Sequence, residues 1–263
     1  HVSLSANKLL HRVVKSNDDS QADACGIALD PLTQFAVIFA TLIHDVDHGG
    51  VSNGQLIKEQ TEVATLYNNK SVAEQNSIDV AWELLMESCY EQLRNCIFTS
   101  DEEYHRFRSL VINAVIATDI FDKDLKEFRN KRWERAFGDE KDNSDLKATI
   151  VIEHLIQASD VAHTMQHWHI YRKWNERFFK ECYAAYVHGR AESDPSEGWY
   201  KGEIGFFDFY IIPLAKKLKN CGVFGVTSEE CLSYAQQNRQ EWEAKGQDVV
   251  ADLIEKVSKE YAC

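Results

Sequence analysis

Residues that interrupt helices are scarce in this chain. Only 3 prolines and 12 glycines occur among 263 residues. Both types break helices, because proline lacks an amide N–H and glycine has too much backbone freedom. A sheet-rich protein needs many tight turns, and those turns depend on glycine and proline. Apolar residues instead recur every three to four positions, as on one side of a helix. The sequence therefore predicts an all-α, compact, multi-helix fold with no sheet of consequence.

The same pattern predicts where the helices lie. Residues 35–43 are apolar on almost every side, which indicates a helix buried in the middle of the fold. Near the end of the chain, one helix is expected over 229–245, followed by a separate amphipathic helix to about Tyr261. The other expected helices cover residues 2–14, 77–93, 104–121, 146–164, 167–187 and 206–218.

Two polar segments are expected to be loops. Residues 138–145 form a short one. Residues 188–202 (HGRAESDPSEGWYKG) hold one proline and three glycines. Such a stretch inside a helical protein is either a mobile flap near a site or a plain surface insertion. No shift in composition divides the chain into separate domains.

Charge and cysteine content exclude some classes of protein. Lys and Arg number 29 against 42 Asp and Glu, a net charge of −13. This acidity argues against a broad nucleic-acid surface, which needs clustered Lys and Arg, but it does not exclude a small phosphate ligand held by metal ions. The seven cysteines form no CxxC pair, which favours a reduced, intracellular location. The longest apolar run, Phe35–Ile43, is too short to span a bilayer.

The segment LIHDVDHGGVSN, residues 42–53, carries the strongest sign of chemistry. His44, Asp45, Asp47 and His48 stand within five positions, directly after the apolar run. Burying so many polar groups costs several kcal/mol unless a metal ion or another partner compensates. One His-Asp pair would fit a capped helix end equally well, but four such residues indicate a metal site.

A second acidic element is needed to complete the coordination of a metal. Asp119 in AVIATDI and Asp160 in LIQASDVAH are single carboxylates at the end of apolar helical stretches, and Glu74 stands in NKSVAEQNS. Each is a candidate ligand. Each could equally be a helix cap or a core hydrogen-bonding residue, and the pattern alone leaves these alternatives open.

Six segments, taken together, resemble those of one known family. HDVDHGGVSN is similar to HDxDHxGxxN, LYNNKSVAEQNS to YNDxSVLENHH, and AVIATDI to a helix with ATD. Further along, ASDVAHTMQHWHIYRKW is similar to ADLSxxxKxxxxxxxW, EIGFFDFYIIPL to QxGFIDxxxxPL, and NRQEW to NRxxW. In order and over nearly the whole chain, these segments resemble the catalytic domain of the class I 3′,5′-cyclic nucleotide phosphodiesterases. The resemblance implies that residues 1–263 are a single HD-type catalytic domain.

The resemblance also implies roles for individual residues. His44, Asp45 and Asp160 match ligands of two divalent ions, usually Zn²⁺ and Mg²⁺ or Mn²⁺, with Asp45 bridging the two. His48, Glu74 and Asp119 match residues that hold metal-bound water or orient the ligands. Phe206 matches the aromatic residue that stacks on the purine, Glu203 takes the position of the glutamine that reads it, and His163 lies near the pocket. His167 and His169 are interpreted as packed or surface residues.

The implied reaction is a metal-dependent hydrolysis of cGMP or cAMP to the 5′-monophosphate in signal transduction. The alternatives are another HD-type nucleotide phosphohydrolase and a cyclic-nucleotide-sensing module that has lost turnover. Family members are often homodimers, and they are often joined to regulatory domains or to membrane-anchored cyclases. A cytoplasmic location is therefore expected, with no membrane insertion by this segment and no nucleic-acid partner.

Two departures from the family pattern matter. Val2 matches the final valine of the family's HNxxHAxxV motif, so the proton-donating histidine and one metal ligand are expected upstream of His1. The chain is thus expected to be a fragment lacking N-terminal helices, inactive or impaired as written. Glu203 replaces glutamine, and a carboxylate only accepts hydrogen bonds, which favours guanine and hence cGMP. Asn76-Ser77 also replace a histidine pair.

Overall fold

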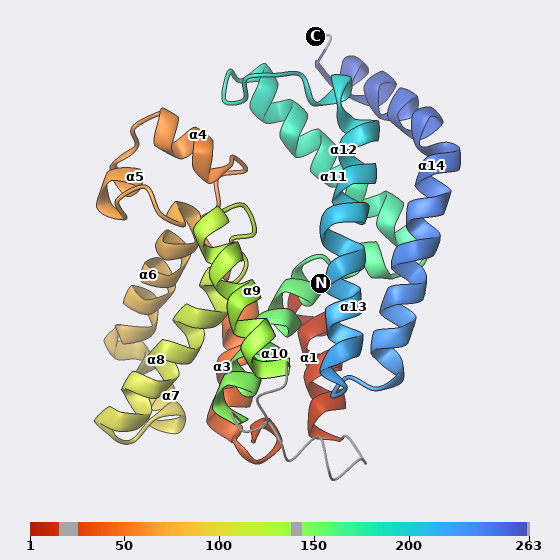
Figure 1. Ribbon diagram of the computed structural model, residues 1–263. Helices are drawn as coiled ribbons and strands as arrows, with labels where there is room; N and C mark the ends of the chain where they lie inside the picture. The colour runs from red at the N-terminus through yellow and green to blue at the C-terminus, as the bar shows by residue number, and fades with distance from the viewer. Residues whose placement is uncertain (16–25, 138–143, 262–263) are drawn as a thin grey trace.

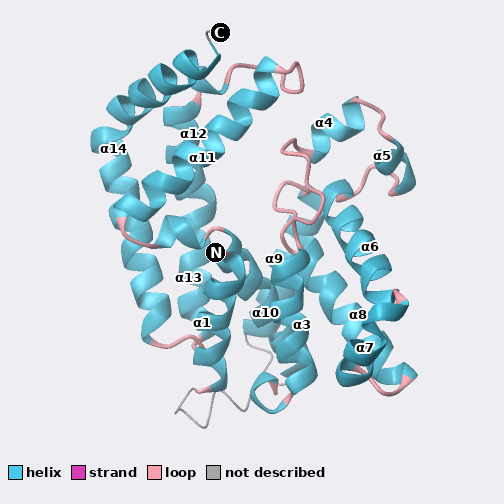
Figure 2. Cartoon of the chain, turned by 180° about the vertical axis from the view of Figure 1, so that it is seen from behind, coloured by secondary structure: helices cyan, strands magenta, loops and turns pink. Residues whose placement is uncertain are grey.

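The computed structural model describes residues 1–15, 26–137 and 144–261 of the chain. Within these ranges every regular element is helical and no strand occurs, which confirms the all-α prediction (Figures 1 and 2). The long helices are α1 (Val2–Val14), α3 (Pro31–Ile43), α6 (Val72–Met86), α8 (Asp101–Ile116), α9 (Lys123–Phe137), α10 (Ser144–Asp160), α11 (Trp168–Val187), α13 (Ile212–Cys221) and α14 (Val226–Tyr261). The short ones are α4 (Asn53–Lys58), α5 (Glu62–Leu66), α7 (Glu91–Ile97), α12 (Trp199–Phe206) and the single turns η2 (Ile27–Leu29), η3 (Ser88–Tyr90), η4 (Ala162–Met165) and η5 (Pro195–Glu197).

The central helix is α10. Its residues 151–159 are all buried, and α1, α3, α8, α9 and α13 pack around it. The prediction that 35–43 is buried on every side is wrong, since Phe35 and Leu42 on α3 are 40% and 68% exposed. Only the sides of α3 that face its neighbours are covered, chiefly by α8 and α1. Apolar composition indicates that a helix can be buried, but the number of neighbours decides how much of it is.

Several predicted helix boundaries are wrong; the helix expected over 104–121, for example, begins at Asp101 and ends at Ile116. The helix expected over 77–93 begins earlier, at Val72, and ends at Met86, because the extended ψ of Glu87 (150°) turns the chain before η3 and α7. The helices expected over 229–245 and beyond are one continuous helix of 36 residues, α14. In the loop expected over 138–145, residues 138–143 lie outside the described part, and Ser144 begins α10.

Gly246 allows α14 to continue where a break was expected. It lies against two aromatic rings, and a Cβ built there would be 2.9 Å from atoms of both Trp242 and Tyr200. Trp242 is fully buried, and its indole donates a hydrogen bond to the carbonyl of Tyr200 at 3.0 Å. The glycine therefore permits a close approach between α12 and α14.

Gly246→Ala should destabilise the protein despite the better helix propensity of alanine. Overpacking of this kind typically costs about 1–3 kcal/mol, against a gain of up to about 1 kcal/mol from propensity. Gly202→Ala is the matched control, because it also lies inside a helix and a Cβ there would meet nothing within 4 Å. Urea denaturation should show Gly246→Ala less stable and Gly202→Ala equally or more stable than the parent. Equal effects at the two glycines would contradict the packing argument.

The segment 188–202 is tied to α4. Arg190 donates two hydrogen bonds to the carboxylate of Glu59, at 3.0 and 2.8 Å, and Lys58 pairs with Glu192 at 2.5 Å. The expected loop is also shorter than predicted, because α12 begins at Trp199.

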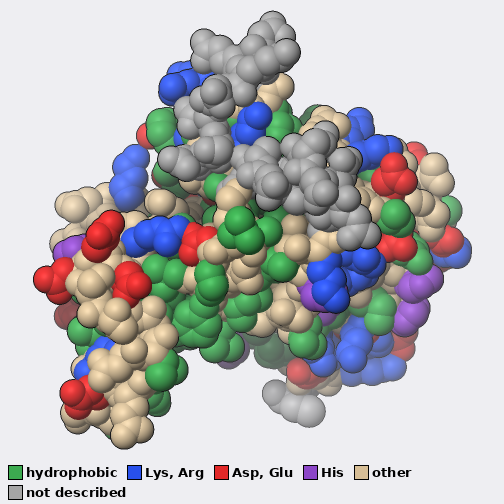
Figure 3. All heavy atoms as spheres, turned by 90° about the horizontal axis from the view of Figure 1, so that it is seen from below, with side chains coloured by type: hydrophobic (Ala, Val, Ile, Leu, Met, Phe, Trp, Pro, Cys, Tyr) green, Lys and Arg blue, Asp and Glu red, His purple; other side chains and the backbone are tan. Residues whose placement is uncertain are grey.

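Charges of both signs occur on the face of the molecule that is seen from below (Figure 3). Viewed from below, acidic and basic side chains alternate with apolar ones (Figure 3). Among the described residues, no helix combines the length and apolar character needed to cross a membrane.

Candidate metal centre

The His-Asp segment begins where α3 ends. His44 follows the last residue of α3 and is 7% exposed, while the next residue, Asp45, is exposed. Asp47 has a positive φ of 63°, which turns the chain away from the helix axis. Asp47 and His48 are also exposed. The premise that all four polar side chains are buried is therefore wrong, because three of them are exposed, and two of these, Asp45 and His48, line a cavity.

His44, Asp45 and Asp160 converge. The Nε2 atom of His44 lies 3.2 Å from Oδ2 of Asp45 and 3.3 Å from Oδ1 of Asp160. One ligand atom from each residue lies within 4.8 Å of the others, although Asp160 comes from the end of a different helix, α10. The structure thus brings together the three residues predicted as ligands.

The hydrogen bond made by Nδ1 of His44 leaves Nε2 as the ring nitrogen that can bind a metal ion. Nδ1 lies 3.1 Å from the backbone carbonyl of Thr41, an acceptor, so Nδ1 carries the proton. Nε2 faces the two carboxylates and, without a metal ion, carries a proton that it donates towards them. Burial alone would lower the pKa of His44, but the hydrogen bonds and negative charges of Asp160 and Asp45 raise it to about 10. Two carboxylates around one imidazole nitrogen strongly favour a cation at this point.

The donor set fits a divalent metal ion. Zn²⁺ takes His nitrogen and carboxylate oxygen at roughly 2.0–2.2 Å, which puts neighbouring tetrahedral ligands roughly 3.4 Å apart. The two measured distances from His44 are close to that value. An ion bound here would replace the proton on Nε2 and offset both carboxylate charges.

Asn53 joins the His-Asp segment to the start of α6. Its side-chain oxygen accepts from the amide of Ala73 at 2.9 Å, and its side-chain nitrogen donates to Glu74 at 2.9 Å. Burial raises the pKa of Glu74, although the bond from Asn53 opposes that shift. Nδ1 of His48 accepts from the amide of Gly50 at 3.2 Å. Sequence reasoning quoted Asn53 only as part of a motif and missed its role in orienting Glu74.

Asn76 and Ser77, which depart from the family pattern, also hold this segment. Asn76 donates to the carboxylate of Asp47 at 3.0 Å, and the Ser77 hydroxyl donates to the carbonyl of Val46 at 2.7 Å. Both bonds fix the turn that follows the metal cluster. Short polar side chains at these positions therefore support the site from α6.

Both carboxylate oxygens of Asp119 accept hydrogen bonds from other groups of the protein. One oxygen accepts from the Ser71 hydroxyl at 2.7 Å, and the other accepts from the amides of Phe121 and Asp122 at 3.2 and 3.1 Å. The side chain is 5% exposed. These bonds match the cap alternative left open by the sequence, while the residue still borders the cavity beside the metal cluster.

A cavity of about 810 Å³ extends from the cluster. It is lined by the segments that follow α3, α8 and α10, the first residues of α4 and α6, one face of α11, the end of α12 and the N-terminal His1 and Val2. Of the nine residues predicted for the site, seven line it: Asp45, His48, Glu74, Asp119, Asp160, His163 and Phe206. No described residue of 188–202 lines it.

Aromatic rings form one wall of this cavity. The ring of His1 lies 4.9 Å from that of Trp174, and the ring of His163 lies 6.1 Å from it. Burial lowers the pKa of His163 to about 4, so its imidazole is neutral at physiological pH. The wall can therefore pack against an apolar ring and still offer a neutral hydrogen-bonding group.

One face of α11 supplies residues that sequence reasoning missed. Trp174, Arg177, Phe178 and Glu181 all line the cavity. Their spacing of three and four residues indicates a single helical face. That signal was present in the sequence, but nothing in it showed that this face meets the metal cluster.

Glu203 does not line the cavity. It is 8% exposed, and its Oε2 accepts from the Tyr171 hydroxyl at 2.5 Å. Asn175 lies 3.5 Å from the same hydroxyl and accepts from the Trp199 indole at 3.3 Å. Burial raises the pKa of Glu203 to about 7, against the effect of the bonds from Tyr171 and Asn175.

The chain after Phe206 widens into one π-helical turn, Phe207–Ile211, before α13. Pro213, near the start of α13, has no N–H to continue an α-helical ladder, and such turns are common at functional sites. The turn places Tyr210 so that its ring stacks on Phe206 at 5.4 Å. Phe206 is thereby held at the cavity by its own helix.

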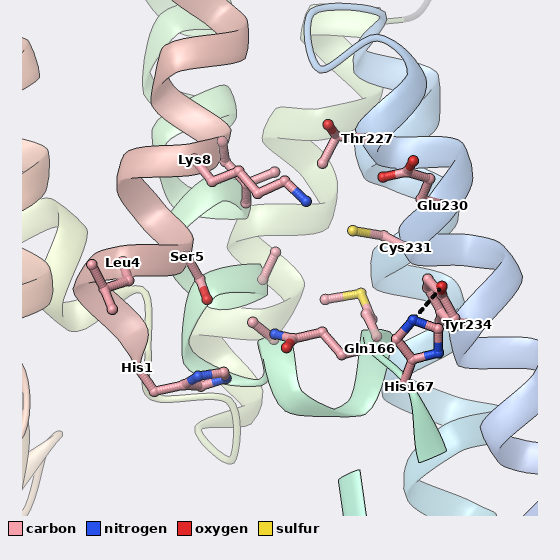
Figure 4. A pocket seen from close by; sticks show the side chains of 14 residues that line it. His1, Leu4, Ser5, Lys8, Gln166, His167, Thr227, Glu230, Cys231 and Tyr234 are labelled. Carbon is pink, nitrogen blue, oxygen red and sulfur yellow. Dashed lines mark hydrogen bonds between the residues drawn. The ribbon is translucent and has the colours of Figure 1, made fainter. Parts of the chain in front are cut away.

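A second cavity, of about 470 Å³, lies between α1, η4 and α14 (Figure 4). On its α14 side, His167 makes a hydrogen bond of 3.0 Å with the Tyr234 hydroxyl. His167 is exposed and bonds to a residue of α14, which fits its interpretation as a packed or surface residue.

Comparison with known proteins agrees with this geometry. Residues 6–222 match the family model described as 3'5'-cyclic nucleotide phosphodiesterase. A curated relative from Caenorhabditis elegans, "Probable 3',5'-cyclic-AMP phosphodiesterase pde-4", is 28% identical over 204 residues, which are 70% of this chain and 29% of that protein. The chain thus spans under a third of the length of that relative.

Two solved structures share the fold. The phosphodiesterase domain of the RhoPDE fusion protein from the choanoflagellate Salpingoeca rosetta has a TM-score of 0.70 at 22% identity, covering 93% of this chain and 77% of the other. A second structure of the rhodopsin phosphodiesterase domain from the same organism has a TM-score of 0.71 at 21% identity, covering 98% and 77%. At such identities the likeness shows the fold alone.

Proposed function

This chain belongs to the 3'5'-cyclic nucleotide phosphodiesterase family, and on that premise we propose that it hydrolyses 3′,5′-cyclic nucleotides to 5′-monophosphates. The observation that carries the proposal is the convergence of His44, Asp45 and Asp160 at the edge of the 810 Å³ cavity. A cavity of that size suits a small organic ligand. We further propose that residues 1–263 are a single catalytic domain.

Different residues of the site would bind the phosphate and the base of the nucleotide. His44, Asp45 and Asp160 would hold divalent ions, which we propose to be Zn²⁺ and Mg²⁺ or Mn²⁺. Such ions, when bound, supply a nucleophilic water and offset charge on the phosphoryl oxygens. Glu74, oriented by Asn53, and His48 stand on the same wall and can exchange hydrogen bonds with water there.

The base would lie at the other end of the cavity. Phe206, supported by the stacked ring of Tyr210, offers an aromatic face. His163 and Trp174 form an aromatic wall of the cavity and can limit how the nucleotide enters. Apolar faces with a few polar groups are the usual lining of small-molecule sites.

The test is direct hydrolysis. The chain, and a version extended upstream by the preceding residues of its gene to include an HNxxHA motif, are incubated with cAMP and cGMP, and products are separated by chromatography. Release of 5′-AMP or 5′-GMP by the extended version supports the proposal. Nucleotide binding without turnover in that version would instead identify a sensing module. Failure to bind either nucleotide would exclude both functions.

The setting of the enzyme is proposed by analogy. One matched structure is a domain of the RhoPDE fusion protein, and the other is a domain of a rhodopsin phosphodiesterase. We propose that this domain likewise acts in the cytosol, as a homodimer and joined to regulatory or cyclase domains. The sequence of the complete gene and the mass of the native protein in solution test these points.

A further inference from the structure

A third cavity adjoins the cavity of the metal centre and is lined by several cationic side chains. It has a volume of about 220 Å³ and is formed by α9, α10 and α13. Three cationic side chains line it: Lys126 and Arg129 from α9, and Lys217 from α13. By volume it holds roughly seven water molecules, at roughly 30 Å³ each. None of the predicted site residues lines it.

The three cations lack close anionic partners. Among the described residues, no carboxylate oxygen lies within 4.0 Å of any of the three side chains, although other Lys and Arg residues nearby form such pairs. Arg129 is 9% exposed and donates to a backbone carbonyl, that of Asp119, at 2.7 Å. Lys217 donates to the side-chain oxygen of Asn130 at 3.0 Å and lies over the Trp133 ring.

Their charges also act on one another. Burial lowers the pKa of Lys217, and the positive charges of Arg129 and Lys126 lower it further, while Cys221 and Glu134 oppose the shift. Glu153 acts on both Arg129 and Lys217, but its Oε1 is paired with a fourth cation, Arg132. In a chain with a net charge of −13, this cavity holds a local excess of positive charge.

We propose that this cavity binds the phosphate group of a small phosphate compound. A tetrahedral dianion placed between Lys217 and Arg129 would offset their mutual repulsion. The guanidinium offers a planar set of N–H donors and the ammonium a compact charge, which are the two usual phosphate contacts. Phe209, 80% exposed at the rim, leaves space beside it for an organic part of the ligand.

The proposed site is separate from the metal centre but adjoins it. Ile120 lines both cavities. Arg129 bonds the backbone of Asp119, and Tyr210, which lines the small cavity, stacks on Phe206 in the large one. A phosphate could therefore occupy the small cavity while the large one holds a nucleotide. This inference does not depend on the proposed hydrolysis.

Isothermal titration of inorganic phosphate into the metal-loaded chain tests the site, with total ionic strength held constant by NaCl. Lys217→Gln should weaken one phosphate-binding event about tenfold or more, since it removes a charge-assisted hydrogen bond. Lys216→Gln is the matched control, because the neighbouring lysine on α13 is exposed and does not line the cavity. Lys217→Arg should retain binding. Circular dichroism melts of each variant confirm folding.

A variant of the metal centre separates the two places where phosphate could bind. Asp160→Asn should leave the event assigned to Lys217 intact. If phosphate binding is instead lost in Asp160→Asn and kept in Lys217→Gln, the ion binds only at the metal centre and the proposal is overturned. It is equally overturned if the parent chain binds no phosphate at millimolar concentration, or if Lys216→Gln weakens binding as much as Lys217→Gln.

Discussion

Asp160→Asn should reduce the affinity of the chain for Zn²⁺ by at least about 100-fold, since loss of a group that merely orients a metal ligand already costs 10–100-fold. The carboxylate lies 3.3 Å from Nε2 of His44 and comes from the end of α10, far along the chain from the segment that supplies Asp45. Without it, only two adjacent residues of one turn remain as ligands. An asparagine keeps the size of the side chain but removes its charge.

Metal content after dialysis, measured by mass spectrometry, and titration with Zn²⁺ give the two readouts. Asp248→Asn serves as the control, because it makes the same change of charge on an exposed surface of α14. Parental Zn²⁺ content in Asp160→Asn would reject the assignment of Asp160 as a ligand. Equal losses in the two variants would show that overall charge, not the centre, determines metal uptake.

Glu203→Gln should stabilise the protein at alkaline pH and leave it unchanged in acid. The pKa of Glu203 is about 7 in the folded protein against 4.5 for an unperturbed glutamate. Because the folded pKa is raised, folding is disfavoured progressively as pH rises from about 4.5 through 7, where the unfolded chain releases this proton first. The full difference corresponds to about 3 kcal/mol above pH 8, at 1.36 kcal/mol per unit. A glutamine does not ionise, so it avoids this cost, and its side-chain oxygen can still accept the hydrogen bond from the Tyr171 hydroxyl.

Urea denaturation at pH 5 and pH 8.5 measures this effect. Glu197→Gln, at an exposed position in the segment before α12, is the control and should show no pH-dependent gain. A stability increase of Glu203→Gln that is the same at both pH values would contradict the ionisation argument. Destabilisation at pH 8.5 would show that the carboxylate is needed in its charged form.

The same variant tests whether Glu203 reads the base. An ionised carboxylate can accept from guanine N1–H and N2–H, but it opposes the lone pair of adenine N1, which costs on the order of 1–3 kcal/mol. A carboxylate that faces the base should therefore favour cGMP by about tenfold to a hundredfold, whereas a Glu203 that stays bonded to Tyr171 outside the cavity should give no such preference. That preference should weaken as pH falls through about 7, where Glu203 gains a proton.

Dissociation constants for cGMP and cAMP give the ratio without requiring turnover. If Glu203→Gln changes stability and leaves the ratio unchanged, Glu203 supports the interface with Tyr171 and does not read the base. A parental preference for cAMP would speak still more strongly against base reading. Stability thus reports on the contact of Glu203 with Tyr171, and the ratio of the two dissociation constants reports on base reading.

Local pattern was sufficient for the helical class. Helices depend on short-range periodicity and on the absence of breakers, both of which can be read from the chain directly. For the metal cluster, local pattern indicated a site at residues 44–48, because polar residues after an apolar helix are costly without a partner, but it left Asp160, Asp119 and Glu74 as alternatives. Only the family resemblance selected Asp160, whose carboxylate lies 3.3 Å from His44 in the structure.

Packing decided the features that local pattern missed. A glycine such as Gly246 indicates a weak point in a helix, yet α14 continues through it. Two aromatic rings occupy the space that a Cβ would need, and this packing explains the glycine. Glu203 matches a base-reading position, yet its carboxylate meets Tyr171 from a helix that begins 35 residues earlier. The cations of the small cavity come from α9 and α13, which are remote in the chain. Periodicity shows which face of a helix is apolar or charged, but which neighbour meets that face depends on contacts between distant segments, and those exist only once the helices have packed.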